Sequence, residues 1–244
     1  MTTRTFATAQ AAGAALLVLA IALSVASVLV AAAPSGATIS NPATETAVNR
    51  SPDSRSDPGG TITTMVLTSV QQNNRWKAYV GNVSGVLTLD DAANLTIYDW
   101  DLSSFTGEVY ASRYGNLTWS TVSCANVTNI QAESSFYGMT NTADDINSTF
   151  NWSVHKSFTV GTTTLTASTC NSTVTYANDT RQVPTASSPY QEVLIKDANN
   201  YVTYLADISD NSQGFDNQSY DFQMIVPEFV NGTVTSYYFY VELS

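Results

Sequence analysis

The chain has 244 residues, of which 12% are charged, and nine Lys and Arg stand against twenty Asp and Glu. This lack of basic residues argues against a nucleic-acid-binding protein, because no basic patch is present to neutralise phosphates. It also argues against docking on an anionic lipid surface. Thirteen Tyr and nine Phe, together with abundant Thr and Val, favour β-strands over helices.

An uninterrupted apolar stretch lies near the N-terminus. Residues 11–33 carry no charge and are long enough to span a bilayer as a helix. Two interpretations of residues 1–33 stay open: a signal peptide cleaved near Ala33 or after Ala37, or a retained membrane anchor. A pilin-type leader fits less well, because the residues after Arg4 do not form the expected processing site. Both interpretations place the rest of the chain outside the cell.

The remainder divides by composition into two parts. Residues 34–60 are rich in Pro, Ser, Thr, Gly and Asp and have few large apolar side chains, which predicts a disordered linker. From residue 61 to 244, short β-type runs alternate with turn residues. This pattern predicts an all-β fold, a β-sandwich or jelly-roll-like domain.

The expected strands are short, rich in Val, Ile, Thr and aromatic residues, and in several places alternate between apolar and polar positions. They cover residues 62–70, 76–84, 86–90, 95–100, 108–112, 117–122, 151–160, 163–168, 173–176, 193–196, 201–208, 220–226 and 234–243. We expect a hairpin between 193–196 and 201–208 and another between 220–226 and 234–243. A single short helix is expected over 143–150, with Thr142 as its N-cap.

The two cysteines, Cys124 and Cys170, predict a disulfide, since an exported chain passes into an oxidising compartment. The bridge would close a loop of roughly 47 residues, worth about 4 kcal/mol in the chain-entropy account. Two separate buried thiols are the alternative. A metal site is not expected, because two thiols and the single histidine, His155, do not complete a zinc ligand set.

The strongest motif is the repeated Asn-x-Ser/Thr triplet, which occurs eleven times. We expect N-glycosylation at most of these positions, because such a density exceeds what the Asn and Thr content alone produces. The triplet at Asn49 is weakened by the proline that follows it. The ten predicted glycosylation sites are Asn82, Asn94, Asn116, Asn126, Asn147, Asn151, Asn171, Asn178, Asn217 and Asn231. An Asn- and Thr-rich composition without attached glycans is the alternative.

Acidic loops give a weaker signal. Asp207, Asp210 and Asp216 lie with Asn211 and Asn217 in or beside one loop, and calcium binds such carboxylate and carbonyl oxygens. Their spacing matches no standard calcium loop, and turns favour Asp and Asn for their own backbone contacts. We therefore expect no cofactor, with calcium as the alternative.

Aromatic and catalytic side chains support no defined activity. The tryptophans are Trp76, Trp100, Trp119 and Trp152. If exposed, they would make a platform for sugar binding, but such residues more often belong to the core. His155 is the single histidine, and the spacing of Ser153 and Lys156 occurs in some acyl transferases only on a helix, whereas a strand is expected here. We therefore expect no enzyme.

The blocks WKAYVGNVSG, TIYDW, GEVYAS, YDFQMIVPE and SYYFYVELS resemble secreted, glycosylated surface proteins of archaea, over about residues 75–244. Archaeal pilins and other filament subunits are similar in plan, with an apolar N-terminus before a glycosylated β domain. The resemblance implies a cell-surface location. It brings no known activity and no functional residues.

These features together predict a structural protein on the cell exterior, a glycosylated filament or envelope subunit. Its expected partners are further copies of itself or neighbouring envelope proteins. Residues 61–70, TITTMVLTSV, could be donated as a strand to a neighbour's sheet, because they are β-prone and follow a flexible linker. The alternative is that they form the first strand of their own domain. The alternative function is a membrane-anchored adhesin, a glycan-binding surface module.

Overall fold

A computed structural model describes residues 33–102, 104 and 106–243. The signal peptide or anchor expected over 1–33 therefore lies outside the described residues, apart from its last one. Within the described part, no helix has the length and apolar character that a membrane crossing requires. The fold is all-β, as the strand pattern predicts, and is built from several antiparallel sheets.

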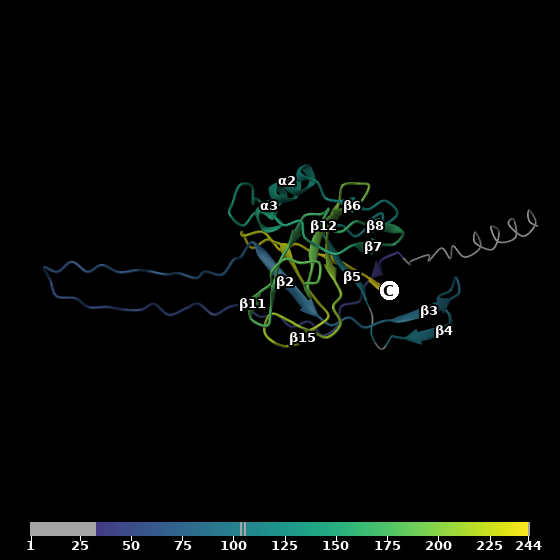
Figure 1. Cartoon of the computed structure of the whole chain (residues 1–244), viewed down its shortest axis with the longest axis horizontal. Helices are drawn as coiled ribbons and strands as arrows, with labels where there is room; N and C mark the ends of the chain where they lie inside the picture. Colours follow the sequence, from purple (N-terminus) through teal and green to yellow (C-terminus); the bar gives the residue numbers. More distant parts are fainter. Residues whose placement is uncertain (1–32, 103, 105, 244) are drawn as a thin grey trace, which may run out of the picture. The chain divides into compact units, whose positions relative to one another are not determined.

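The largest sheet among the described residues has seven strands (Figure 1). Its strands follow the order β1-β17-β5-β13-β12-β6, and β9 also pairs with β12. Their bounds are β1 (Ser35–Gly36), β17 (Tyr238–Leu243), β5 (Gly107–Ser112), β13 (Val202–Asp207), β12 (Glu192–Lys196), β6 (Ser123–Cys124) and β9 (Ser172–Thr173). All six residues of β5 are buried, so this strand runs through the centre of the domain.

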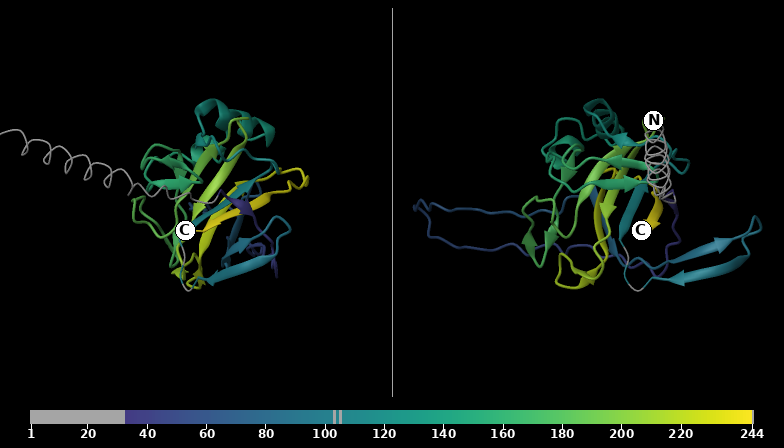
Figure 2. Two further views of the ribbon diagram at one scale, coloured as in Figure 1. Left: turned by 90° about the vertical axis from the view of Figure 1, so that its right-hand side faces the viewer. Right: turned by 45° about the vertical axis from the view of Figure 1, so that its right-hand side comes forward.

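One face of this sheet is covered by a second, two-stranded sheet and by two helices. The sheet consists of β2 (Trp76–Gly81) and β16 (Phe222–Pro227), and the helices are α2 (Val127–Phe136) and α3 (Ile146–Thr149). Both helices lie at one end of the strands (Figure 1, Figure 2). The core between these layers includes Val109, Ala111, Ile130, Phe150, Leu194, Tyr204, Met224 and Val226.

The opposite face is covered by the hairpin of β7 (Phe158–Val160) and β8 (Thr163–Leu165). Phe158, Val160 and Leu165 pack there with Tyr110 and Leu205 in a second core cluster. The predicted disulfide between the two cysteines is confirmed, and it joins the short edge strand β6 to the segment before β9. Three smaller hairpins complete the strands: β3 (Val86–Asp90) with β4 (Thr96–Asp101), β10 (Tyr176–Ala177) with β11 (Thr180–Arg181), and β14 (Ser212–Gln213) with β15 (Ser219–Tyr220).

One predicted hairpin is confirmed and the other is wrong. β12 and β13 pair across a tight turn, in which Asn200 adopts a positive φ of 63° and donates its N–H to the Asp197 carbonyl. The strands expected over 220–226 and 234–243 do not pair with each other. β16 pairs with β2, whereas β17 pairs with β5, so the connection between them crosses from one layer to the other.

The helix prediction is correct in place but incomplete. α3 occupies part of the expected range 143–150, and its N-cap is Asp145 rather than Thr142. The longer helix α2 was not predicted, because it is short of strong helix formers and has no apolar stripe. Its start is fixed by a reciprocal capping box, in which the side chains of Asn126 and Asn129 each accept the other's backbone N–H.

Two expected strands are absent from the described structure. Residues 117–122 form a turn and irregular backbone, and residues 62–70 have no strand partner. Part of the expected linker 34–60 belongs to the domain, because β1 at its start pairs with β17. The chain then runs from residue 37 to 74 without regular structure before it enters β2 (Figure 1).

Candidate functional site

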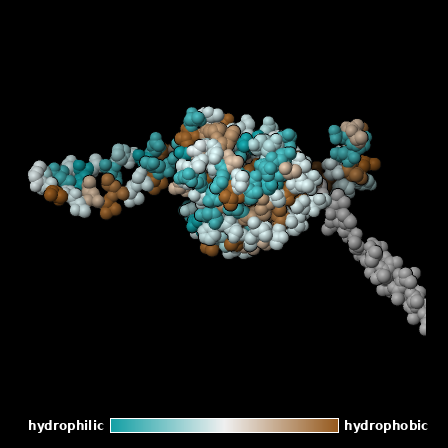
Figure 3. All heavy atoms as spheres, turned by 90° about the horizontal axis from the view of Figure 1, so that it is seen from above, coloured by the Kyte–Doolittle hydropathy of each residue, from teal (hydrophilic) through white to brown (hydrophobic). Residues whose placement is uncertain are grey.

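Two elements expose apolar side chains to an unusual degree. Residues 61–70 lie outside every strand and helix, and Ile62 and Val66 are 100% and 93% exposed. The β3–β4 hairpin is exposed along both strands, and Ile97 is 72% exposed. Figure 3 shows apolar residues, coloured brown, on both elements. Exposed apolar surface of this kind marks an interaction site more often than a free surface.

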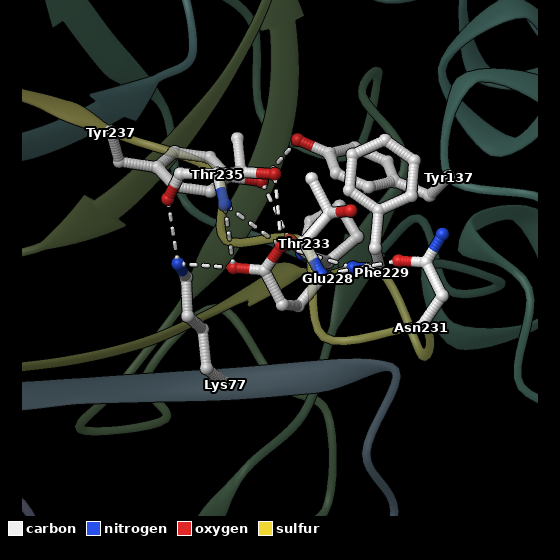
Figure 4. A network of polar contacts seen from close by, with 9 residues as sticks. Lys77, Tyr137, Glu228, Phe229, Asn231, Thr233, Thr235 and Tyr237 are labelled. Atoms are coloured by element: carbon white, nitrogen blue, oxygen red, sulfur yellow. Dashed lines mark hydrogen bonds and ion pairs between the residues drawn. The ribbon is translucent and has the colours of Figure 1, made fainter.

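The start of β2 is held by a polar network that includes Lys77, Glu228 and Thr235 (Figure 4). The Lys77 ammonium donates to Glu228 Oε2 at 2.5 Å and to the Thr235 carbonyl at 2.9 Å. The Glu228 carboxylate also accepts hydrogen bonds from the backbone N–H and hydroxyl of Thr235 and from the Phe229 N–H. Lys77 is therefore fixed to the loop between β16 and β17.

The protonation of Glu228 follows from these contacts. Partial burial alone would raise the pKa of Glu228, but the hydrogen bonds from Lys77, Phe229 and Thr235 outweigh burial and lower the pKa. The carboxylate is thus charged at neutral pH and pairs with the Lys77 ammonium. Tyr237 extends the network, because its hydroxyl donates to the Pro227 carbonyl at 2.9 Å and lies 2.7 Å from the Tyr137 hydroxyl. β2 and the β16–β17 loop are consequently joined by a continuous set of polar contacts.

A row of three buried carboxylates crosses the centre of the large sheet. Glu108 on β5 lies directly opposite Asp207 on β13 and Glu242 on β17, so all three side chains share one face. All three residues are buried. The β7–β8 hairpin covers this carboxylate row, and the Gly161 N–H in its turn donates to both oxygens of Glu242.

One cation faces the carboxylate row. Lys156 forms an ion pair with Asp207, and the Tyr110 hydroxyl donates to Glu242 Oε2 at 2.9 Å. Burial, together with the nearby charges of Glu242 and Asp207, raises the pKa of Glu108 to about 8. Burial raises the pKa of Asp207 and Glu242 as well. The folded protein therefore holds protons in this row at pH values where the unfolded chain has released them.

The imidazole of His155 connects two segments of the backbone through hydrogen bonds. Its imidazole is buried, and Nε2 accepts the backbone N–H groups of Thr169 and Cys170 at 3.0 and 2.9 Å. The proton must then be on Nδ1, which lies 2.5 Å from the Lys156 carbonyl and donates to it. Burial lowers the pKa of His155, which favours this neutral form. The ring therefore ties the segment that carries Cys170 to the start of β7.

The predicted glycosylation sites differ in exposure. Nine of the ten, all except Asn171, have exposed side chains, and Asn49 in the long loop is exposed as well. Asn171 is partly buried, and its Nδ2 donates to the Phe150 carbonyl at 2.8 Å. Asn126 is exposed and accepts the helix cap hydrogen bond through its oxygen, so its amide nitrogen is not used in that bond.

The acidic residues considered for calcium are not gathered into one group. Asp207 belongs to the carboxylate row, whereas Asp216 accepts hydrogen bonds from the Gln218 N–H and the Tyr220 hydroxyl. Asp210 accepts from the side-chain amide of Asn211. Across the described residues, no three His, Cys, Asp or Glu side chains come together as metal ligands.

The tryptophans divide between core and surface. Trp76 packs near Phe150, and Trp119 meets Tyr110 edge-on, whereas Trp152 is 38% exposed. Trp100 on the β3–β4 hairpin is 51% exposed, and its ring stacks on Tyr98 at a centroid distance of 6.0 Å. Tyr98 and Trp100 thus present two aromatic faces to solvent.

The chain matches no protein-family model, no curated protein and no solved structure.

The carboxylate row generates a prediction for stability as a function of pH. The pKa of Glu108 is raised in the folded state, so its stabilising contribution is complete below the unfolded pKa near 4.5 and is lost as pH rises to about 8. Glu108→Gln, which does not ionise, should flatten the fall in unfolding free energy between these limits, by up to about 1.4 kcal/mol per pH unit. Urea titrations at several pH values measure this slope.

Glu45→Gln removes the same charge from the exposed loop and serves as the control. The control should follow the wild-type slope, and Glu108→Gln should be more stable than wild type at pH 8. Identical slopes for Glu108→Gln and the wild type would show that Glu108 does not take up a proton on folding.

Proposed function

We propose that this protein is an exported structural glycoprotein that assembles with further copies of itself on the cell exterior, as a filament or envelope subunit. The observation that carries the proposal is residues 61–70, an uncharged β-prone segment that has no strand partner and exposes its apolar side chains. Burial of such a segment requires another surface. Donation as a strand to a neighbouring subunit supplies that surface and satisfies the backbone hydrogen bonds as well.

Two further features support the exported setting. The disulfide is consistent with an oxidising, extracellular compartment. The exposed Asn-x-Ser/Thr triplets offer accessible asparagines for glycan attachment, and neither residues 61–70 nor β2 contains such a triplet. Glycans at the predicted positions would leave both elements themselves unmodified, with the glycan of Asn82 directly after the end of β2. The resemblance to glycosylated archaeal surface and filament proteins agrees with this proposal.

The second candidate function is a membrane-anchored adhesin that binds glycans. The exposed stacked pair of Tyr98 and Trp100 supports it, since sugars stack on aromatic faces of this kind. If this function is correct, the protein should give a signal on a glycan array that Trp100→Ala abolishes. Trp152→Ala is the control at another exposed tryptophan. The absence of any signal from the glycosylated wild-type protein would contradict this candidate.

Deletion of residues 61–70 tests the assembly. Because the segment contributes no strand to its own domain, the deletion variant should keep the wild-type circular dichroism spectrum and melting temperature within a few degrees, but should fail to form polymers. Light scattering and negative-stain imaging measure the polymer. Deletion of the ten residues 40–49 from the same exposed loop is the matched control and should still assemble. An unfolded 61–70 deletion variant would instead identify the segment as a strand of its own domain.

The exposure of the acceptor residues predicts which glycans form. Asn171 should be unoccupied, because its amide nitrogen is partly buried and donates to the Phe150 carbonyl. The nine exposed sites of the predicted set should carry glycans. Peptide mass spectrometry of the exported protein measures the occupancy at each position. A fully occupied Asn171, or bare asparagines at all exposed positions, would contradict this assignment.

A further inference from the structure

The free edge of β2 has the geometry of an acceptor for a donated strand. Among the described residues, β2 pairs with β16 on one side and has no strand on the other. Arg75 and Gly81 accept hydrogen bonds across the pair from Glu228 and Asp221, so odd-numbered residues of β2 face β16. Because an antiparallel pair alternates, Ala78 and Val80 direct their backbone N–H and C=O groups toward the open edge.

A strip of half-buried apolar side chains lies beneath this edge. Tyr79 of β2 packs edge-on against Phe239 of β17, with ring centroids 4.9 Å apart. Phe239, Val241 and Leu243 of β17 belong to the first core cluster but are only partly buried. The second layer of the sandwich ends at β2. An additional strand beside β2 would therefore extend that layer over β17.

The edge of the larger sheet is less available. β1 already pairs with β17 at Tyr240 and Val241, and the Ala37 N–H donates to the Phe239 carbonyl. An incoming strand at β17 would have to displace these contacts. The edge of β2 requires no such displacement.

Residues 61–70 form a segment that suits this edge. Residues 61–70 carry no charge, and their alternation places Ile62, Val66 and Val70 on one face and Met65 and Leu67 on the other. Ten residues are more than enough to pair with the six residues of β2. One face can cover the half-buried side chains of β17, while the backbone completes the hydrogen bonds of β2.

The chain immediately before β2 is held by contacts to another part of the domain. The Asn73 side-chain amide donates to Asp144 Oδ2 at 3.1 Å, and the Arg75 guanidinium donates to the Gly138 carbonyl at 3.1 Å. The Trp76 indole N–H donates to the Asp144 carbonyl at 2.8 Å. These contacts hold residues 73–76 on the segment between α2 and α3. They fix the point at which the chain enters β2, so that only residues 71 and 72 between the two segments are outside these contacts and free to form the turn of a hairpin of residues 61–70 with β2 of the same chain.

We infer that the open edge of β2 accepts residues 61–70 from a second copy of this chain. This inference rests on the proposed assembly and names the surface on which the assembly occurs. Each copy donates one segment and accepts another, so the contact is heterologous and propagates from subunit to subunit.

Cysteine cross-linking of the full chain tests the inference. Leu67→Cys in one copy and Val80→Cys in another each add one free thiol, since both natural cysteines form the disulfide, and both side chains lie on the face turned away from β17 when Val66 is turned toward it. After the two variants assemble together under mild oxidation, a covalent dimer should form at least tenfold more than with Val48→Cys as the donor. Val48 is 90% exposed in the same loop, close to the 85% of Leu67. Val66→Cys, on the opposite face, covers the case in which Met65 and Leu67 are the side chains turned toward β17.

The outcomes separate the inference from the proposed function. If polymers form but neither Val66→Cys nor Leu67→Cys cross-links to Val80→Cys, β2 is not the acceptor edge. The proposal that the protein assembles with copies of itself would then still stand. A cross-link within a single chain of the double variant Leu67→Cys with Val80→Cys would show that the strand beside β2 comes from the same chain, not from a second copy. A protein that remains monomeric under all conditions would overturn both.

Discussion

The pairing of β5 with β13 and β17 is the interaction on which the rest of the structure depends. All six residues of β5 are buried, and the strand has a hydrogen-bonded neighbour on each side. Because side chains alternate along a strand, β5 directs Val109 and Ala111 into one core cluster and Tyr110 into the other. It also sets Glu108 between two further carboxylates. Both core clusters and the buried carboxylate row thus depend on the position of β5.

The two faces of that sheet are covered to different extents. The β7–β8 hairpin closes one face over the carboxylate row, whereas the second layer on the other face ends at β2 and leaves part of β17 half-buried. A strand supplied by another copy would complete the layer. Full burial of a Val or Ile side chain is worth roughly 1.5–3 kcal/mol, so three such residues on one face would give a stable contact. In this account, assembly adds to the second layer of each subunit a strand that its own chain does not supply.

The predicted glycosylation sites and the charge of the donated segment fit the same account. Residues 61–70 are uncharged, and neither they nor β2 contains an Asn-x-Ser/Thr triplet, whereas the exposed acceptor residues lie elsewhere, with Asn82 directly after β2. The buried carboxylates do not contribute to assembly directly. Since Glu108, Asp207 and Glu242 all have raised pKa values, they favour the folded domain at acidic over alkaline pH.

Patterns within short stretches of sequence predicted the features that depend on residues close together in the chain. The alternation and turn residues identified most strands and the β12–β13 hairpin, and the two cysteines, together with the expected export, predicted the disulfide. Strand pairing over long separations was not predictable, so β16 and β17 were expected to pair although each belongs to a different sheet. The carboxylate row was missed for the same reason. Glu108, Asp207 and Glu242 are far apart in sequence, and only the register of three strands brings them together.

Residues 61–70 show the limit of a propensity argument. Their β-branched side chains favour a strand, but a strand needs a neighbour, and the sequence alone does not say whether that neighbour lies in the same chain. The structure adds the anchoring of residues 73–76 to the α2–α3 segment and the open edge of β2. These two features, and not the propensity, favour a neighbour in another chain.

Electron cryomicroscopy of the full-length protein, purified after export, tests the central claim most directly. The account predicts filaments or sheets of subunits in which an additional strand lies along β2 and traces to residues 61–70 of an adjacent copy. Monodisperse single subunits, or subunits in which residues 61–70 pair with β2 of their own chain, would contradict it.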